Sequence, residues 1–281
     1  MKKKIKLVDI TFIIVTYRSN QIIETCLNFL PNESPKIIIE NSNDISFKNK
    51  MEKNHLNLKC FLTEANLGYG AANNLGIKKS ETEYVFILNP DVIIKRDNLN
   101  EIIEILNLES FDLAAPINFD DKDNYSFKEN KILHVENVKG FAMIIKKDFF
   151  LKYLFDENIF LYLEEIDLCN RIRKDNGKII LLNSFVKHIG GNSHGDRKDL
   201  EMEKSRNWHW MWSKFYFYKK NYGYISGLIK TLPNFINCLI KYIFYKILGK
   251  EENLIKYKMR FLGLYNSYLL KKSYYRPYEK N

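Results

Sequence analysis

The sequence lacks the features that mark a disulfide-rich, zinc-binding or membrane-spanning protein. Among its 281 residues it has only four cysteines, which lie far apart, with no Cys-x-x-Cys pair and no histidine at zinc-finger spacing. We therefore expect reduced cysteines in a cytoplasmic protein. No stretch offers about 18 uninterrupted apolar residues, so no spanning helix is expected. Internal repeats and low-complexity segments are also absent from the sequence.

Acidic residues are scarce in the last part of the chain. From Arg206 onward there are 15 Lys and Arg but only 3 Asp and Glu, and the same stretch holds all three Trp and 20 of the 40 aromatic residues. A basic, aromatic-rich region favours a polyanionic partner, either nucleic acid or an anionic membrane surface. Lys and Tyr alternate with aliphatic residues at helical spacing and no nucleic-acid recognition motif occurs, so we favour the membrane surface and expect no nucleic acid.

Strand-like and helix-like segments alternate over the preceding part of the chain. Runs of β-branched and aromatic residues predict strands, and apolar residues repeating every three or four positions predict helices between them. The predicted strands are 10–15, 36–41, 58–62, 84–88 and 112–116. This alternation predicts an α/β fold with a mostly parallel, Rossmann-like sheet. Strand signals end at about residue 205, so we expect a domain of residues 1–205 and a helical region of residues 206–281.

A carboxylate follows one predicted buried strand. In FILNPDVII, residues 86–94, the apolar run is interrupted by Asn89, Pro90 and Asp91. Ligands of open α/β sheets bind in the crevice outside the carboxyl ends of the strands, which makes Asp91 a candidate binding residue. Asn, Pro and Asp are also common turn residues, and for this segment taken alone a polar turn is the better interpretation.

A glycine-rich loop follows the third predicted strand. In EANLGYGAANNLGIKKS, residues 64–80, three glycines are interleaved with asparagines. Glycines at a strand-to-helix junction let the backbone approach a ligand closely, and a helix N-terminus favours phosphate. The loop is not a dinucleotide-binding fingerprint, and a plain connecting turn remains the alternative.

Two adjacent acids begin a predicted helix in FLYLEEIDLCNRIRK, residues 160–174. Helical spacing places Glu164 beside Asp167 and pairs Asp167 with Arg171, whereas Glu165 falls on a different face. Acidic residues at a helix start also favour the helix dipole. Surrounded by apolar residues, an acid here would have a raised pKa suited to proton abstraction. The local pattern is compatible with either role.

Seven segments in order carry a resemblance to a known family. IIVTYRSN, IIIENSND, NLGYGAANNLG, FILNPDV, VKGFAMIIKKDFF, FDENIFLYLEEIDLCNRI and VKHIGGNSHG together resemble family 2 glycosyltransferases, especially the rhamnosyltransferase-like branch that builds bacterial surface polysaccharides. The resemblance covers roughly residues 8 to 222. It implies a GT-A type fold, with a nucleotide-binding α/β half followed by an acceptor-binding half.

The resemblance also implies a set of site residues. Asp91 corresponds to a one-carboxylate form of the family's metal-binding DXD element and would hold Mg²⁺ or Mn²⁺ against the donor diphosphate. His188 corresponds to a histidine that completes the metal shell, and a histidine hydrogen-bonded at a strand end is the alternative. Residues implied to frame the donor are Thr16, Tyr17, Arg18, Glu40 (where the family usually has Asp), Asn66, Gly68, Asn73 and Asn89.

For the acceptor side the resemblance implies two positions. Glu165 occupies the general-base position, normally the Asp of a Glu-Asp pair, and we favour it over Glu164 as the catalytic base. Gly140 corresponds to the position at which the backbone lines the acceptor.

The function implied is that of an inverting, metal-dependent hexosyltransferase. A sugar, rhamnose being one candidate, would pass from a nucleoside-diphosphate sugar to a hydroxyl of a growing, lipid-linked surface glycan of the cell envelope. We expect a cytoplasmic protein, peripheral on the inner face of the plasma membrane. The alternatives are a catalytically inactive relative that serves as a binding or scaffold subunit, and a nucleic-acid-binding protein.

Overall fold

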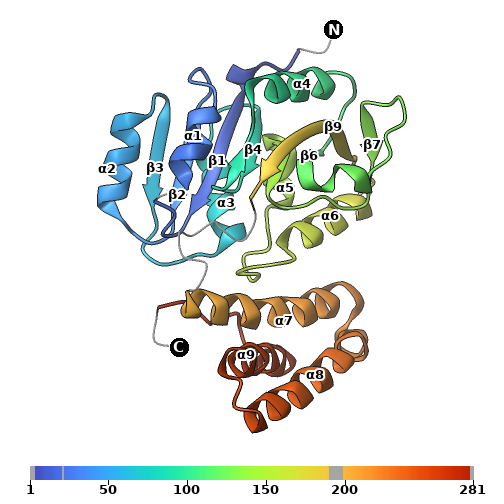
Figure 1. Ribbon diagram of the computed structural model, residues 1–281. Helices are drawn as coiled ribbons and strands as arrows, with labels where there is room; N and C mark the ends of the chain where they lie inside the picture. Colours follow the sequence, from blue (N-terminus) through green and yellow to red (C-terminus); the bar gives the residue numbers. More distant parts are fainter. Residues whose placement is uncertain (1–3, 21, 190–198, 279–281) are drawn as a thin grey trace. The chain divides into compact units, whose positions relative to one another are not determined.

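The computed structural model describes residues 4–20, 22–189 and 199–278 (Figure 1). The chain divides into two units, one comprising Met1–Phe155 with Glu165–Arg197 and the other Asp156–Glu164 with Lys198–Asn281. The boundary expected after residue 205 falls inside the first helix of the second unit, and nine residues of the earlier chain belong with that unit.

The first unit is an α/β structure, as the alternating pattern predicts. Its helices and short 3-10 turns are η1 (Leu7–Asp9), α1 (Ile23–Phe29), α2 (Ile45–Asn54), α3 (Tyr69–Lys79), α4 (Arg96–Leu106), η2 (Phe119–Asn124), α5 (Lys147–Tyr153) and α6 (Glu164–Lys174). Its strands are β1 (Ile10–Thr16), β2 (Lys36–Glu40), β3 (Leu58–Leu62), β4 (Tyr84–Leu88), β5 (Val92–Ile93), β6 (Leu113–Asn118), β7 (Ile132–His134), β8 (Ala142–Lys146) and β9 (Ile179–His188).

The strands form one mixed sheet in the order β3-β2-β1-β4-β8-β6-β9-β5, with β7 also paired to β9. The half that comes first along the chain, β3-β2-β1-β4, is wholly parallel. β8 runs antiparallel to both β4 and β6, and β5 and β7 run antiparallel to β9. Parallel strands place their carboxyl ends at one edge of the sheet, so the loops after β1, β2, β3 and β4 gather there.

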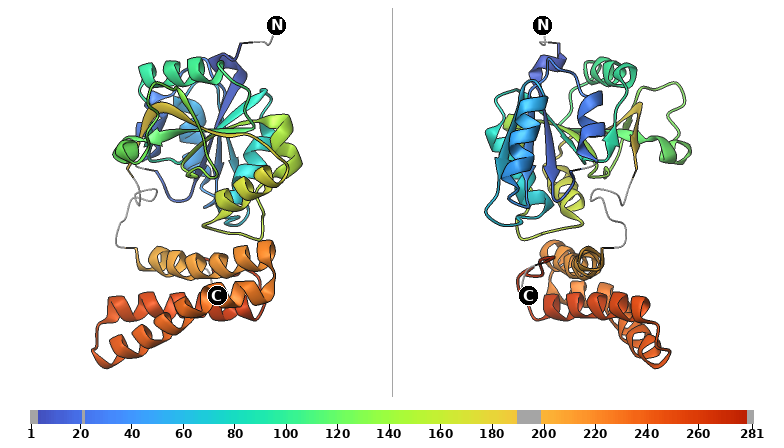
Figure 2. Two further views of the ribbon diagram at one scale, coloured as in Figure 1. Left: turned by 90° about the vertical axis from the view of Figure 1, so that its right-hand side faces the viewer. Right: turned by 60° about the vertical axis from the view of Figure 1, so that its left-hand side comes forward.

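Helices cover both faces of this sheet (Figures 1 and 2). Alternate residues of β1 face opposite sides: Phe12 and Ile14 join the core beneath α1, α2 and α4, while Ile13 and Val15 join the core beneath α3, α5 and α6. Every residue of β1 is buried, as expected of a parallel strand covered on both faces.

The second unit is helical. Its three helices α7 (Leu200–Tyr222), α8 (Tyr224–Ile247) and α9 (Glu251–Tyr268) each pack against the other two (Figure 2). Trp208 and Trp212 are buried in one of its cores, and Met211 and Phe215 in the other. A Cβ atom built at Gly263 of α9 would lie 2.2 Å from the Trp208 carbonyl oxygen, so only glycine permits this helix–helix approach.

Two expectations about the sequence's composition meet the structure directly. All four cysteines are buried and free. Among the helices of the described ranges, none is both long and apolar enough to cross a bilayer.

Candidate functional site

Three strand-end loops are joined by one amide side chain. Asn41, directly after β2, accepts a hydrogen bond from Thr63 Oγ1 at 3.1 Å at the end of β3, and its Nδ2 donates to the Gly68 carbonyl oxygen at 3.2 Å. Its backbone N–H donates to the Thr16 carbonyl oxygen at the end of β1. Asn41 is buried. The loops that carry most of the predicted donor residues are therefore held together at the carboxyl edge of the parallel strands.

The predicted donor residues after β1 differ in their exposure. Thr16 is fully buried and its hydroxyl faces the Ile39 carbonyl oxygen at 3.5 Å, whereas Arg18 is exposed. Arg18 has a φ of 52°, and its guanidinium carbon lies 5.9 Å from the centre of the Tyr17 ring. A left-handed backbone in a residue other than glycine is uncommon and is often found where a loop has a functional role.

Glu40 organises its own loop. Its carboxylate accepts hydrogen bonds from the Ser42 hydroxyl, from the Ser42 backbone N–H at 3.0 Å and from the Asp44 backbone N–H at 2.9 Å. Asp44 in turn caps α2 by accepting from the Phe47 N–H at 2.9 Å. The loop after β2 is thus rigid, and a contact from Glu40 to a nucleoside remains a prediction.

The glycine-rich segment is a strand-to-helix junction in which each glycine has a distinct role. Gly68 has a φ of 83°, which favours glycine, and its N–H is held by Asn66 Oδ1 at 3.0 Å. Gly76 packs α3 against the sheet, because a Cβ there would lie 2.6 Å from the Ile13 Cγ2 atom. Asn73 is buried, and the described chain offers its Oδ1 no hydrogen-bond donor. A buried acceptor left without a partner is costly and is expected where a ligand or water supplies the donor.

Asn89, Asp91 and His188 form a cluster after β4. The imidazole Nε2 of His188 lies 3.4 Å from Asp91 Oδ1 and 3.4 Å from Asn89 Nδ2. Asp91 is buried, and the antiparallel pairing of β5 with β9 sets Val92 opposite His188. Residues 97 positions apart in sequence are therefore neighbours because of the sheet register.

Two residues fix the orientation of the His188 imidazole. Its ring stacks on Phe141, with ring centroids 4.6 Å apart and planes 12° from parallel. Its backbone N–H donates to Asn118 Oδ1 at 3.0 Å. A histidine held on both sides is prepared to present Nε2 to a ligand at little entropic cost.

The electrostatic influence of Asp91 reaches a neighbouring thiol. Burial, together with the negative charge of Asp91, raises the pKa of Cys26 to about 12. The Cys26 thiol lies 4.0 Å from the Asn89 carbonyl oxygen, in the wall behind the cluster. This cysteine is therefore a neutral, structural side chain at ordinary pH.

The cluster suits a divalent cation that keeps most of its shell for substrate and water. Among the residues described, no group of three or more His, Cys, Asp or Glu side chains is placed to hold a metal ion. Asp91 and His188 nevertheless offer one carboxylate oxygen and one imidazole nitrogen 3.4 Å apart, close to the roughly 3 Å that separates adjacent ligands of an octahedral ion. Hard cations that act on phosphates commonly use one or two protein ligands, and imidazole suits Mn²⁺ better than Mg²⁺. The residues present fit such an ion.

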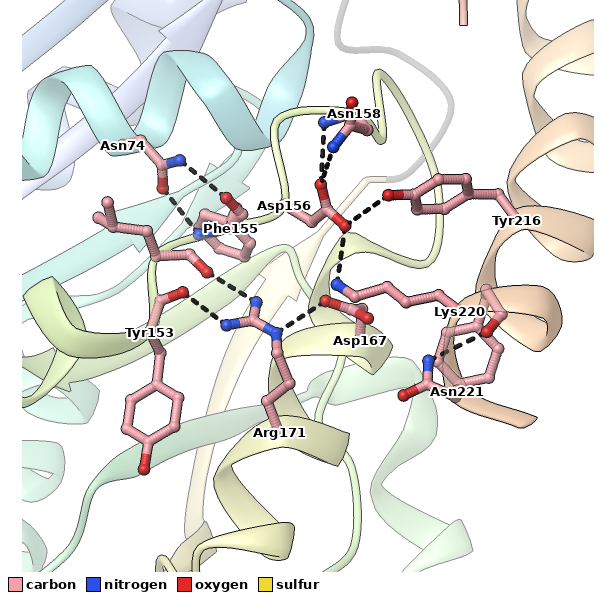
Figure 3. Close-up of polar contacts among 12 residues, drawn as sticks. Asn74, Tyr153, Phe155, Asp156, Asn158, Asp167, Arg171, Tyr216, Lys220 and Asn221 are labelled. Atoms are coloured by element: carbon pink, nitrogen blue, oxygen red, sulfur yellow. Dashed lines mark hydrogen bonds and ion pairs between the residues drawn. The ribbon is translucent and has the colours of Figure 1, made fainter. Parts of the chain in front are cut away.

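α6 is positioned by the ion pair that its sequence predicts (Figure 3). Arg171 Nε donates to Asp167 Oδ2 at 2.9 Å, and the other guanidinium nitrogens donate to the carbonyl oxygens of Tyr153 at 2.5 Å and Leu154 at 2.6 Å. Asn74 of α3 binds the next residue, Phe155, through both its amide atoms, at 2.8 and 2.9 Å. These contacts fix the segment that precedes α6, and confirm that Asp167 has a structural role.

Glu165 has the environment of a general base. Its side chain is partly buried, and desolvation raises its pKa, with a smaller opposing effect from the backbone N–H groups of Glu165 and Ile166. Gly140 leaves the room that this carboxylate occupies, because a Cβ at Gly140 would lie 3.4 to 3.6 Å from the Cβ, Cγ and Cδ atoms of Glu165. Glu164 is buried and lies on the other face of the helix.

One dipeptide connects the base to the metal-ligating cluster. Gly140 lies against Glu165, and the next residue, Phe141, stacks on His188 and accepts the Asn89 N–H at 2.9 Å. Consecutive Cα atoms are about 3.8 Å apart, so the base and the cluster stand at neighbouring positions of one segment. Tyr69 of α3 holds that segment by donating from its hydroxyl to the Gly140 carbonyl oxygen at 2.7 Å.

A sequence-family model for glycosyl transferase family 2 matches residues 11–169, more than half of the chain and the region that carries this site up to α6. The protein belongs to glycosyl transferase family 2. The resemblance inferred from the seven segments is thereby confirmed.

Characterised family 2 proteins with related sequences take part in glycan synthesis. The low-salt glycan biosynthesis hexosyltransferase Agl10 of Haloferax volcanii is 25% identical over 195 residues, which span 60% of this chain and 62% of Agl10. The rhamnosyltransferase WbbL of Escherichia coli K12 is 22% identical over 236 residues, 70% of this chain and 88% of WbbL. The chain thus spans less than two thirds of Agl10 but most of WbbL.

Solved structures show that the fold is GT-A-like. The mannosyltransferase PcManGT of Pyrobaculum calidifontis, in complex with GDP-Man and Mn²⁺, superposes with a TM-score of 0.56 at 11% identity, over 92% of this chain and 86% of that one. Residues 1–349 of S. aureus TarS superpose with a TM-score of 0.51 at 16% identity, over 95% and 93% of the two chains.

Several residues that build this family 2 site carry no signal in a single sequence. Asn41 lies within a segment recognised by its motif, yet only the structure gives its loop-joining role. Tyr69, Asn118 and Phe141 act on the site through contacts that span 70 or 71 residues or through ring stacking on His188. The aromatic residue directly after Gly140 was the available hint for Phe141.

Proposed function

We propose that this protein is an inverting glycosyltransferase that moves a sugar from a nucleoside-diphosphate donor to an acceptor hydroxyl. One observation carries the proposal: the Gly140-Phe141 segment places a carboxylate of raised pKa, Glu165, beside the Asp91–His188 cluster. An inverting transfer needs a base for the incoming hydroxyl and a separate site for the leaving diphosphate, and these two features can provide them.

The chain's own residues would divide the reaction between them. Glu165 accepts the proton of the acceptor hydroxyl while that oxygen attacks the anomeric carbon from the face opposite the diphosphate. The bond from the anomeric carbon to the diphosphate oxygen breaks, and its electron pair leaves with the nucleoside diphosphate. The product is a glycoside of inverted configuration.

Asp91 and His188 would hold a divalent cation. When bound, Mg²⁺ or Mn²⁺ supplies Lewis-acid stabilisation of the charge that grows on the leaving diphosphate. The N-terminus of α3 after Gly68 offers backbone N–H groups to the same phosphates. The Mn²⁺ and GDP-Man present in PcManGT, and the Mn²⁺ and UDP present in GalNAc-T7, support a metal-assisted reaction on a nucleotide sugar.

The nature of the sugar and acceptor follows from the relatives. Agl10 and WbbL are a glycan-biosynthesis hexosyltransferase and a rhamnosyltransferase, which supports a hexose donor, rhamnose being one candidate. We infer a lipid-linked saccharide of a surface glycan as the acceptor, since such a substrate requires an enzyme held at a membrane.

A nucleotide-sugar panel tests the proposal. The purified protein with Mn²⁺ is screened for a rise in melting temperature, because a true donor stabilises the fold by mass action. The stabilising donor is then assayed for release of nucleoside diphosphate in the presence of saccharide acceptors. We expect Asp91→Ala to abolish both the Mn²⁺-dependent stabilisation and transfer while its circular dichroism stays unchanged. An Asp91→Ala protein with wild-type activity and metal response would refute the assignment, and an active-site binding profile without turnover would favour a scaffold subunit.

We further propose that the protein attaches to the inner face of the plasma membrane through α8. One face of this helix packs into the core of the helical unit, through Leu228, Phe235 and Cys238. A second face is exposed and is formed by seven aliphatic residues at spacings of three and four, here called the α8 ridge: Ile225, Ile229, Leu232, Ile236, Ile240, Ile243 and Ile247. Ile225 and Ile247, at its two ends, are 73% and 78% exposed.

Positive charge accompanies the α8 ridge. Lys230, Lys246 and Lys250 are exposed along or just beyond α8, and the chain from Arg206 onward carries an excess of basic residues. An apolar helical face bordered by lysines matches the boundary between lipid headgroups and acyl chains of an anionic membrane. Each basic residue near such a surface contributes about 1 kcal/mol.

Vesicle flotation tests this attachment. Binding should require anionic lipid and be released by high salt, and Ile236→Asn/Ile243→Asn should weaken it strongly, since burying each isoleucine contributes about 1.5–3 kcal/mol. Leu56→Asn/Leu108→Asn is a matched control, because these leucines are 69% and 65% exposed in the α/β unit. Equal binding to neutral vesicles, or equal losses in both double variants, would contradict the proposal.

A further inference from the structure

The helical unit contains a cavity of about 350 Å³ that is lined by basic and aromatic side chains. Its basic side chains are Lys219 of α7 and Lys271, Lys272 and Arg276, which follow α9. Glu157 is the acid among its lining residues. The four cations therefore exceed the acidic charge by three, which favours an anionic occupant.

The walls of the cavity are rigid. Trp212 stacks on Tyr216 with ring centroids 4.9 Å apart, and its indole N–H donates to the Lys271 carbonyl oxygen at 3.0 Å. Ser267 donates to the Trp212 carbonyl oxygen at 3.0 Å. These contacts fix the backbone from which Lys271 and Lys272 project. A site whose backbone is already ordered binds a ligand at a lower entropic cost.

Asp156 orders the opposite wall (Figure 3). Its carboxylate accepts hydrogen bonds from Asn158 N and Nδ2 at 3.0 and 2.8 Å, from the Tyr216 hydroxyl at 2.9 Å and from Lys220 Nζ at 2.7 Å. Asn158 and Tyr216 line the cavity. Asp156 thus holds two lining residues in place and pairs with Lys220, which is not a lining residue.

The lining lysines, in contrast, keep their charge for the cavity. Within the described ranges, Lys219, Lys271 and Lys272 form no ion pair with a carboxylate. Lys219 Nζ lies 5.4 Å from the centre of the Tyr216 ring, and Lys271 and Lys272 are exposed. The Arg276 guanidinium is held over the Phe160 ring at 3.9 Å and donates to the Ser273 and Tyr275 carbonyl oxygens. Three ammonium groups thus accompany one fixed guanidinium.

We propose that this cavity binds a phosphate ester. Lysine and arginine side chains with nearby hydroxyls, here those of Ser267 and Ser273, are the groups that recognise phosphate oxygens, and the aromatic wall suits the organic part of the ester. Its volume lies at the lower end of the roughly 300–1,000 Å³ typical of small-ligand sites, which fits a phospholipid headgroup or a sugar phosphate. All lining residues belong to the helical unit. The site is therefore independent of sugar transfer and is measured without it.

Two probes distinguish a soluble phosphate ester from a lipid headgroup. Glycerol phosphate is titrated by calorimetry, and flotation is measured with vesicles of phosphatidylglycerol in phosphatidylcholine and of phosphatidylcholine alone. The test variant is Lys271→Ala/Lys272→Ala, and the charge-matched control is Lys250→Ala/Lys258→Ala, whose lysines are exposed in the same unit but do not line the cavity. Both variants retain the α8 ridge.

We expect the test variant to bind at least one anionic probe roughly tenfold or more weakly for each lost contact, and the control to bind as wild type does. Selective loss of glycerol phosphate binding identifies a soluble ester, and selective loss of phosphatidylglycerol vesicle binding identifies a lipid headgroup. The proposal is overturned if wild type binds neither probe, or if the two double variants lose binding equally. Circular dichroism confirms that both variants are folded.

Discussion

Replacing Glu165 by Gln removes a proton acceptor and leaves the shape of the site almost unchanged. Loss of a general base typically lowers the rate by 10²–10⁴-fold, or about 3–5 kcal/mol of transition-state stabilisation. Burial raises the pKa of Glu165, so the ionised carboxylate destabilises the folded state as pH rises above its ordinary range. Gln carries no such charge. The variant should therefore lose activity while being as stable as wild type, or more stable, at neutral pH.

The packing of Gly140 gives a second, smaller perturbation of the same carboxylate. An alanine Cβ at this position would lie 3.4 Å from Glu165 Cβ and 3.6 Å from its Cδ, which is ordinary contact. Gly140→Ala should fold, but the added methyl group excludes water from the carboxylate and raises its pKa further. Activity should then reach its plateau at a higher pH than in wild type, with a nearly unchanged rate on the plateau.

The assay is release of nucleoside diphosphate from the stabilising donor, measured from acidic to alkaline pH for wild type, Glu165→Gln, Gly140→Ala and Glu164→Gln. Wild-type activity should rise with pH through a limb above the usual range of a glutamate, and Glu164→Gln should be impaired less than Glu165→Gln. If Glu164→Gln is the more damaging change, Glu164 is the base. If Gly140→Ala leaves the limb where it was, Glu165 does not titrate in this reaction.

Three further predictions concern stability. Arg171→Met should lower the free energy of unfolding in urea by about 3–5 kcal/mol, because it leaves a buried carboxylate unpaired and two carbonyl groups without their donor; a loss below 1 kcal/mol would mean that the ion pair is dispensable. Hydrogen bonds from Lys220 and Asn158 outweigh the desolvation that raises the pKa of Asp156 and bring it to about 2, so its carboxylate stabilises the fold above pH of about 4 and this contribution, about 1–2 kcal/mol after allowance for solvent screening, is lost as pH falls toward 2; Asp156→Asn should flatten that dependence in acid titrations followed by fluorescence. Gly263→Ala should destabilise the helical unit by about 1–3 kcal/mol or more, since its Cβ would overlap the Trp208 carbonyl oxygen, and an unchanged melting temperature would show that α7 and α9 are not so closely packed.

The sequence by itself determined the features that depend on local pattern. Unbroken apolar runs predicted the β1–β4 strands nearly to the residue, because a parallel strand covered on both faces has no polar position. Helical spacing predicted the Asp167–Arg171 pair, since residues four apart are neighbours on any α-helix. Ordered motifs were enough to recognise the glycosyltransferase family.

Only the tertiary structure decided which distant residues meet. The Asp91–His188 pair depends on the register of β5 against β9, and the approach of Gly140 to Glu165 depends on how α6 packs beside the segment before β8. The same holds for α8: its sequence shows apolar residues on several sides, and packing against α7 and α9 decides that one side is buried while the α8 ridge stays exposed. Local sequence fixes periodicity, whereas the register and burial of a given side chain follow from contacts between segments far apart in the chain.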